Sequence, residues 1–115
     1  MNKSKIAGIA FNVPDNIVTN HDLEKMMDTT DEWIQTRSGI KERRWVKPGV
    51  ANSDLALPAC QEAIQNAGIS PDDIDAIVVG TVTSDFNFPG MAPIIQQKLG
   101  TVSYTHLRAH ETILD

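Results

Sequence analysis

Residues 28–45 read Asp-Thr-Thr-Asp-Glu-Trp-Ile-Gln-Thr-Arg-Ser-Gly-Ile-Lys-Glu-Arg-Arg-Trp, and this stretch carries the strongest pattern in the chain. Thr30, Asp31 and Glu32 favour the start of a helix, because hydroxyl and carboxylate groups satisfy or complement the free N–H groups of the first turn. Gly39 is placed to end that helix. The stretch therefore predicts a short helix followed by a charged segment.

The predicted helix carries Trp33 and Arg37 four residues apart, which puts both side chains on one face. An indole can stack on a nucleobase, and a guanidinium can hold phosphate oxygens through two parallel hydrogen bonds. From the residues alone, the pair is a candidate site for a nucleotide with phosphates. The alternative is structural: a half-buried packing tryptophan beside a surface arginine.

Residues 3–100 as a whole resemble the β-ketoacyl-acyl-carrier-protein synthase III family, condensing enzymes of the thiolase superfamily. Besides residues 28–45, the resemblance rests on residues 5–14, on Thr-Asn-His-Asp-Leu-Glu within residues 19–27, and on residues 68–69, 74–81, 88–89 and 98–100. It implies a thiolase-like layered α/β fold. Because the family is about three times longer, this chain would hold an incomplete N-terminal portion with mostly parallel, buried strands.

The resemblance also implies roles for four residues. Trp33 would lie against the adenine of coenzyme A, and Arg37 and the hydroxyl of Thr29 would bind the nucleotide and its phosphates. Phe88 would reach across a dimer interface and help to close the acyl pocket of the partner subunit. A local hydrophobic plug is the alternative for Phe88.

The activity implied is the condensation of an acyl-CoA primer with malonyl-acyl carrier protein, which starts fatty-acid synthesis. In the family a cysteine takes the acyl group, and a histidine and an asparagine support decarboxylation and carbon–carbon bond formation. None of these three catalytic residues is expected in this chain, so we predict that the chain itself is inactive. The full-length enzyme would be a homodimer that needs no cofactor beyond its coenzyme A thioester substrate.

Two alternatives to this function stay open. One is another condensing enzyme of the same superfamily, which makes hydroxymethylglutaryl-CoA, long-chain ketones or quinolones. The other is a non-catalytic module that binds coenzyme A.

The resemblance stops after Gly100. The family's nucleophilic cysteine would follow soon after, but residues 110–113 read His-Glu-Thr-Ile. Residues 103–112 resemble a sequencing-adapter sequence translated as protein. We therefore expect residues 1–100 to be part of a condensing-enzyme domain and residues 101–115 to be a foreign tail. A genuine, divergent tail is the alternative.

Composition excludes several other classes. A hydrophobic content of 41% and a charged content of 22% are ordinary globular values. The net charge is −5, and the basic residues of segment 41–44 are interrupted by Glu42, so no nucleic-acid footprint is expected. The chain has neither an apolar run long enough for a membrane span nor a secretion signal, so we expect a cytoplasmic protein.

The single cysteine and the histidines carry little chemistry. Cys60 stands among alanines on the apolar stripe of a predicted helix, whereas a nucleophilic cysteine needs an electropositive, partly exposed setting. We interpret it as a packing residue. His106 and His110 have helical spacing, but Leu107 stands where a zinc-protease motif requires glutamate, so no metal site is predicted.

Hydrophobic periodicity and turn residues predict the remaining elements. These are strands over residues 5–11 and 74–82 and helices from 19 to about 27, from Asn52 or Ser53 as cap to about 67, and over 93–99. Thr19 and Asp22 resemble a capping box at the start of the first helix, with aspartate in place of the usual glutamate or glutamine. Met26 and Met27 are expected in the core. Pro58 predicts that its helix starts late or bends. This order of elements is typical of a layered α/β domain.

Overall fold

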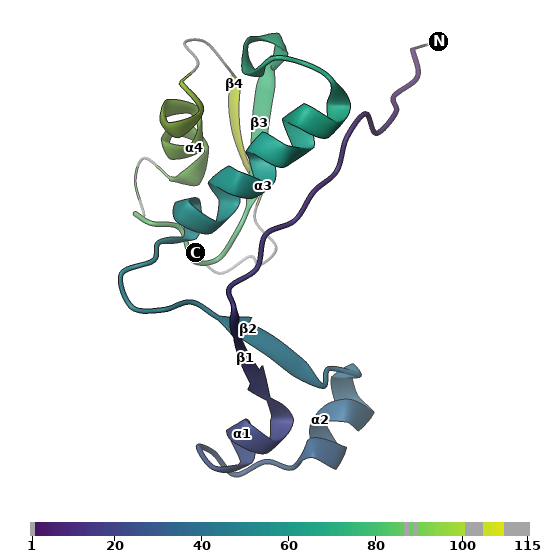
Figure 1. Cartoon of the computed structure of the whole chain (residues 1–115), viewed down its shortest axis with the longest axis vertical. Coiled ribbons are helices and arrows are strands. Elements are labelled where there is room, and N and C mark those ends of the chain that lie inside the picture. Colours follow the sequence, from purple (N-terminus) through teal and green to yellow (C-terminus); the bar gives the residue numbers. More distant parts are fainter. Residues whose placement is uncertain (1, 87, 89, 101–104, 110–115) are drawn as a thin grey trace. The chain divides into compact units, whose positions relative to one another are not determined.

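The computed structural model describes residues 2–86, 88 and 90–100, together with the backbone of residues 105–109. The chain forms two compact units. One is Val13–Val50, and the other combines Met1–Asn12 with Ala51–Asp115. Each unit contains both helices and strands (Figure 1), so the predicted mixture of α and β elements is confirmed.

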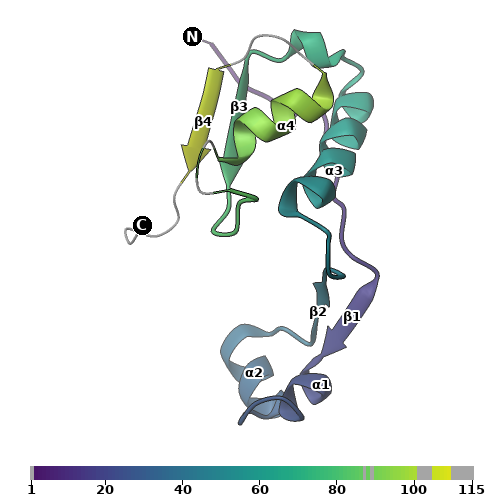
Figure 2. The same cartoon turned by 90° about the vertical axis from the view of Figure 1, so that its left-hand side faces the viewer.

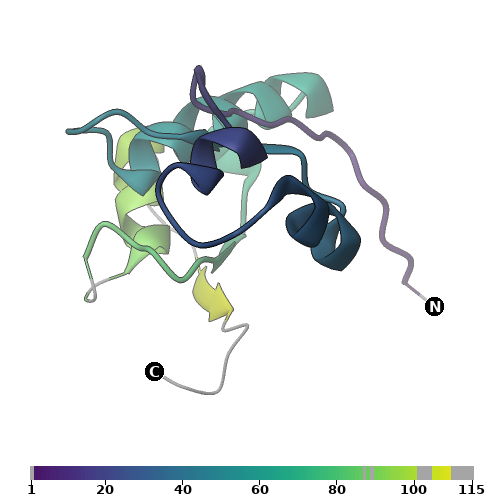
Figure 3. The same ribbon diagram turned by 90° about the horizontal axis from the view of Figure 1, so that it is seen from below.

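The smaller unit is built on an antiparallel pair of strands. β1 (Asn16–Thr19) pairs with β2 (Glu42–Trp45), with Asn16 opposite Trp45 and Thr19 opposite Glu42. Two helices, α1 (Asn20–Glu24) and α2 (Asp31–Ser38), lie between these strands in sequence. Figure 3 shows the loop that joins the two helices.

Local sequence signals set the start of α1. The Thr19 hydroxyl accepts a hydrogen bond from the backbone N–H of Asp22 at 3.2 Å, and the Asp22 carboxylate accepts one from the backbone N–H of Thr19 at 2.9 Å. This reciprocal pair is the predicted capping box. The helix ends at Glu24, earlier than expected, and Met26 and Met27 are 55% and 54% exposed. Their assignment to the core is wrong, because the chain leaves the helix before their side chains can turn inward.

The start and end of α2 agree with the sequence prediction. The Thr30 hydroxyl accepts a hydrogen bond from the backbone N–H of Trp33 at 3.1 Å, which satisfies one free donor of the first turn. Gly39 follows the last turn with φ of 73°, a left-handed conformation that glycine adopts without steric cost. The position of the candidate pair on an eight-residue helix is therefore fixed by local sequence.

The larger unit packs helices against a parallel pair of strands. Its elements are α3 (Asn52–Ala67), the 3₁₀ turn η1 (Pro71–Asp73), β3 (Ala76–Gly80), α4 (Met91–Leu99) and β4 (Thr105–Ala109). β3 and β4 run parallel, and α4 packs against both strands and against α3 (Figure 2). The side chains of Met91, Ala92 and Ile95 on α4 are buried.

Mostly parallel, buried strands were expected. In the described chain only β3 and β4 pair in parallel, whereas β1 and β2 are antiparallel, and the burial of β3 is only partial. Along β3, exposed and half-buried residues alternate, and Val78 is 62% exposed. Because successive side chains of a strand point to opposite faces, one face is covered and the other is open in the described part of the chain.

Residues 5–11 form no strand, so that prediction is wrong. The segment runs extended beside α3, and the Asn66 amide donates a hydrogen bond to the Ile9 carbonyl at 3.1 Å. Gly8 permits this approach, because a Cβ atom there would lie 2.4 Å from the Ala63 carbonyl oxygen. The segment's contacts go to a helix, while Ile6 and Ile9 remain 84% and 76% exposed.

Two expectations for α3 also need correction. The N-cap residue is Ala51, not Asn52 or Ser53, which lie inside the first turn. The late start at Pro58 is wrong, because the helix runs from Asn52 through Pro58 to Ala67, and the bend there stays a prediction. The helix packs on α4 and on the N-terminal segment, although proline cannot donate a backbone hydrogen bond within it.

Candidate functional site

The structure brings Trp33 and Arg37 into direct contact on α2. The guanidinium carbon of Arg37 lies over the Trp33 ring, 5.4 Å from its centroid, which is within the range of a cation–π interaction. Trp33 is 57% exposed, and no residue of α2 is buried. This exposure does not support the structural alternative, in which Trp33 was a half-buried packing residue.

Two hollows that are open to solvent flank the tryptophan. One, of about 270 Å³, is lined by Asp28, Thr29, Thr30 and Trp33. The other, of about 350 Å³, is lined by Thr30, Glu32, Trp33, Thr36 and Arg37. Thr29 lines the first hollow and Arg37 lines the second, and Trp33 lines both. Each hollow has about the volume of a small ligand pocket.

The chemistry of this surface suits an aromatic, anionic ligand. The exposed indole offers a stacking surface, and Arg37 is the only cation among the residues that line the two hollows. Hydroxyls from Thr29, Thr30 and Thr36 provide donors and acceptors beside it. We call the set of Trp33 and Arg37 on α2 and Thr29 just before it the α2 face from here on.

Sequence reasoning missed the residue that ties α2 to the rest of its unit. Asn20 is completely buried, and its amide nitrogen donates a hydrogen bond to the Asp31 carboxylate at 2.8 Å. Asp31 also accepts a hydrogen bond from the Gln35 amide. This bond is the largest cause of the lowered pKa of Asp31, and the bond from Asn20 is the next largest. The backbone N–H of Asp31 donates to the Glu24 carboxylate at 2.7 Å. The only local signal for Asn20 was a polar residue at a helix start.

Phe88 lies in the larger unit and is 89% exposed. This exposure does not support the alternative of a local hydrophobic plug. The loop before it is anchored on α3: the Asn52 amide donates to the Thr83 carbonyl at 2.7 Å, and the Ser53 N–H donates to the Asp85 carboxylate at 3.0 Å. An exposed aromatic residue next to a fixed loop segment is suited to contact another surface.

Cys60 and the histidines add no candidate site. Burial raises the pKa of the Cys60 thiol, which disfavours the thiolate that a nucleophile needs. His110 lies outside the described residues, and His106 is in strand β4, so their helical pairing does not apply. Within the described ranges, no group of three or more histidine, cysteine or acidic residues is placed to hold a metal.

The described helices are also too short or too polar to cross a membrane.

Comparison with known proteins finds relatives that share the name β-ketoacyl-[acyl-carrier-protein] synthase III. No family model matches the chain. A β-ketoacyl-[acyl-carrier-protein] synthase III from Caldanaerobacter subterraneus is 52% identical over 98 residues, which are 85% of this chain and 30% of that protein. The protein of the same name from Listeria monocytogenes is 55% identical over 95 residues, 83% of this chain and 30% of that protein.

The fold gives the same result. The crystal structure of a 3-oxoacyl-[acyl-carrier-protein] synthase III from Aquifex aeolicus superposes with a TM-score of 0.82 and 40% identity, covering 92% of this chain and 34% of that one. The expected resemblance to synthase III and the thiolase-like α/β fold are confirmed. The chain spans about 30% of the length of the curated relatives it matches.

Proposed function

We propose that residues 1–100 form the N-terminal part of a β-ketoacyl-acyl-carrier-protein synthase III. Such an enzyme is an acyltransferase that condenses an acyl-CoA primer with malonyl-acyl carrier protein at the start of fatty-acid synthesis. The observation that carries this proposal is the contact between Trp33 and Arg37 on an exposed helix of a chain more than 50% identical to synthases of that name. None of the three other condensing reactions has a comparable observation in its favour.

In this proposal the α2 face binds the nucleotide end of coenzyme A. The adenine stacks on the Trp33 indole, Arg37 pairs with phosphate oxygens, and the Thr29 hydroxyl donates to the same part of the ligand. Their arrangement around the two hollows supports these roles. The nucleotide is remote from the thioester carbon, so these residues would anchor and orient the substrate without taking part in bond making.

Catalysis itself would belong to other residues of the whole enzyme. The nucleophilic cysteine, histidine and asparagine that the resemblance implies are not assigned to any position of this chain. Cys60, with its raised pKa, does not take the first role. We expect that the purified 115-residue chain forms neither an acyl-cysteine nor a condensation product.

The whole enzyme would be a cytoplasmic homodimer that uses no metal and no cofactor besides the coenzyme A thioester, and it would not bind nucleic acid or membranes. Phe88 would contact the partner subunit and help to enclose its acyl group. Its 89% exposure and the anchored loop before it support this assignment.

We also propose that residues 101–115 are foreign to the natural protein. The alignments with the two curated relatives cover 98 and 95 residues of the 115. Sequencing the source locus across the codon for Gly100 tests this. A reading frame that leaves the printed sequence after Gly100 is expected. A frame that encodes residues 101–115 as printed would favour the genuine, divergent tail.

A second candidate function is a non-catalytic module that binds coenzyme A. The observation in its favour is that Thr29, Trp33 and Arg37 all lie in one compact unit, Val13–Val50, which also contains the hydrogen bonds that fix α2. This candidate shares the binding site with the first and differs from it in predicting no condensation by the whole natural protein.

Calorimetric titration of coenzyme A into the chain tests the site. Base–aromatic stacking contributes about 1–3 kcal/mol, so Trp33→Ala is expected to weaken binding about tenfold. Arg37→Ala should weaken it as well, and pantetheine, which lacks the nucleotide, should bind no more tightly to the wild-type chain than to either variant. If Trp33→Ala and the wild-type chain bind coenzyme A with equal affinity, the proposed site is wrong.

A further inference from the structure

We propose that Asn20 is the positioning residue of the coenzyme A site: one buried amide group holds both ends of α2 and so fixes the direction in which Trp33 and Arg37 point. This inference rests on the proposed function, because it concerns the same α2 face. It adds a residue that makes no contact with the ligand and acts through the helix.

The first observation is that the Asn20 amide bridges the two ends of the helix. Its Nδ2 donates to Asp31 Oδ1 at 2.8 Å and to the Ile40 carbonyl oxygen at 2.8 Å. Asp31 is the first residue of α2, and Ile40 directly follows Gly39, the residue that ends it. A single side chain thus sets the distance and orientation of both termini of an eight-residue helix.

The second observation is that Asn20 itself is held firmly by the strand pair. Its Oδ1 accepts a hydrogen bond from the Arg43 guanidinium at 2.7 Å, and its backbone N–H donates to the Lys41 carbonyl at 3.1 Å. Arg43 also donates to the Val18 carbonyl at 3.2 Å. Asn20 is 0% exposed, so water cannot replace these partners. The amide transmits the position of β1 and β2 to α2.

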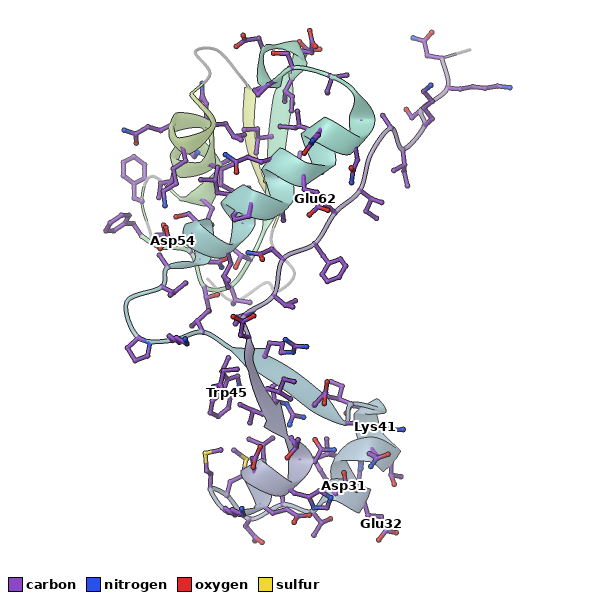
Figure 4. All side chains as sticks on the ribbon, in the orientation of Figure 1. Asp31, Glu32, Lys41, Trp45, Asp54 and Glu62 are labelled. Atoms are coloured by element: carbon purple, nitrogen blue, oxygen red, sulfur yellow. The ribbon has the colours of Figure 1, made fainter. Side chains whose placement is uncertain are left out.

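The third observation is that α2 has no fully buried side chain, and its apolar residue Ile34 is only half-buried. The hydrogen bonds at the first turn and at the C-terminal end of the helix therefore contribute much to its orientation. Figure 4 shows Asp31 between α1 and α2, while Glu32, the next residue, points away from them. Asp31 in turn accepts two hydrogen bonds from the Gln35 amide, each 2.8 Å long, within the helix.

The chemistry of an amide is required at this position. The amide nitrogen of Asn20 donates hydrogen bonds to a carboxylate and a carbonyl, and its amide oxygen accepts one from a guanidinium. In Asn20→Asp, the contact with Arg43 is kept but a carboxylate faces the Asp31 carboxylate and the Ile40 carbonyl. Oxygen then opposes oxygen, and the start of α2 is pushed away from its place.

Exchanging the side chains of Asn20 and Asp31 should restore part of the contact between them. In the double variant Asn20→Asp/Asp31→Asn, residue 31 can donate an amide hydrogen to the new carboxylate and still accept from Gln35. One of the two contacts to α2 returns, while the contact to the Ile40 carbonyl does not. We therefore expect partial recovery of coenzyme A binding.

The test is calorimetric titration of coenzyme A into the whole 115-residue chain and its variants. Asn20→Asp should weaken binding about tenfold, comparable to the loss of the stacking residue itself. The double variant should recover part of that loss. Asn16→Ala, which alters an exposed asparagine of β1 with no side-chain hydrogen bond in the described structure, should bind as wild type.

Tryptophan fluorescence separates positioning from general stability. In a Trp45→Phe background, Trp33 is the only source of tryptophan emission. Asn20→Asp should change the emission of Trp33, while the far-ultraviolet circular dichroism stays that of a folded chain. If Asn20→Asp does not fold, Asn20→Ser takes its place, because a serine hydroxyl is too short to reach both ends of α2. It should weaken coenzyme A binding in the same way.

The possible failures are distinguishable. If the wild-type chain does not bind coenzyme A, or if Trp33→Ala does not weaken binding, the proposed function fails and this inference fails with it. If Trp33→Ala weakens binding but folded Asn20→Asp or Asn20→Ser binds as wild type, only the positioning role is overturned. A loss in Asn20→Asp without any recovery in the double variant also contradicts it.

Discussion

The carboxylate of Asp85 accepts hydrogen bonds from both the backbone N–H and the hydroxyl of Ser53. Ser53 is completely buried in the first turn of α3, and Asp85 lies 32 residues further along the chain. The Lys98 ammonium group donates to the same hydroxyl at 2.6 Å and to the Asp54 carboxylate at 2.9 Å. A distant loop therefore helps to cap α3, since Ala51 has no side-chain oxygen of its own.

Removal of the Asp85 carboxylate should destabilise the larger unit. Asp85→Ala leaves the Ser53 N–H without its acceptor in a buried setting, which costs about 1–3 kcal/mol. Urea unfolding followed by circular dichroism should show a lower midpoint than for wild type. Asp75→Ala, at an exposed position, is the matched control and should leave the midpoint unchanged. Equal midpoints for the two variants would contradict this role of Asp85.

Gly8 should not tolerate a side chain. A Cβ atom there would lie 2.4 Å from the Ala63 carbonyl oxygen and 2.7 Å from the Ala67 nitrogen, and both are backbone atoms that cannot rotate away. Gly8→Ala should therefore detach residues 5–11 from α3 or cost about 1–3 kcal/mol of stability. Hydrogen exchange should be faster in α3 of this variant than in an exposed-site control, Ser4→Ala. Unchanged exchange would show that the segment does not pack there.

Acid should destabilise the chain through three carboxylates. The backbone N–H of Thr19 lowers the pKa of Asp22, the Gln35 amide lowers that of Asp31, and the backbone N–H of Ala51 lowers that of Asp54. Each folded-state pKa lies below the ordinary value of 3.8, so the unfolded chain binds protons first as the pH falls.

The contribution of these groups to stability is therefore complete above the ordinary pKa and is lost as the pH falls through the lower folded values. These three carboxylates should leave the urea midpoint unchanged between neutral pH and about pH 5. At pH values below about 4, the midpoint should decrease. Asp22→Asn should have a smaller acid dependence than wild type. A midpoint that is the same at pH 3 and pH 6 would be incompatible with these shifts.

Cys60 should react slowly with thiol reagents. Burial raises its pKa, so the thiolate is scarcer at neutral pH than in a free cysteine. A chromogenic disulfide reagent should modify the folded chain more slowly than the same chain in denaturant at the same pH. Modification at equal rates in both conditions would mean that Cys60 is exposed and activated, and its packing role would be wrong.

Local patterns in the sequence were sufficient for much of the site. The spacing of Trp33 and Arg37 predicted their shared face, and Thr19 with Asp22 predicted the capping box, because each depends only on residues within one helical turn. Asn20 was missed because its partners are 11, 20 and 23 residues away. The burial of a polar residue depends on the tertiary structure, and it produces no periodic pattern in the nearby sequence.

The incorrect strand at residues 5–11 has the same origin. Its apolar pattern is that of a strand, but pairing requires a neighbour, and the described chain offers this segment a helix instead. Ligand and partner measurements test the proposed roles of Thr29, Trp33, Arg37 and Phe88.

The most direct measurement is a condensation assay on a chimera that joins residues 1–100 to the remaining part of the Listeria monocytogenes synthase III, the 55% identical relative. We expect a folded chimera that forms the β-ketoacyl product from acyl-CoA and malonyl-acyl carrier protein. Trp33→Ala within it should raise KM for acyl-CoA about tenfold with kcat nearly unchanged, as expected for a remote binding residue. A folded chimera without condensation activity, or an unchanged KM in Trp33→Ala, would contradict the proposed function.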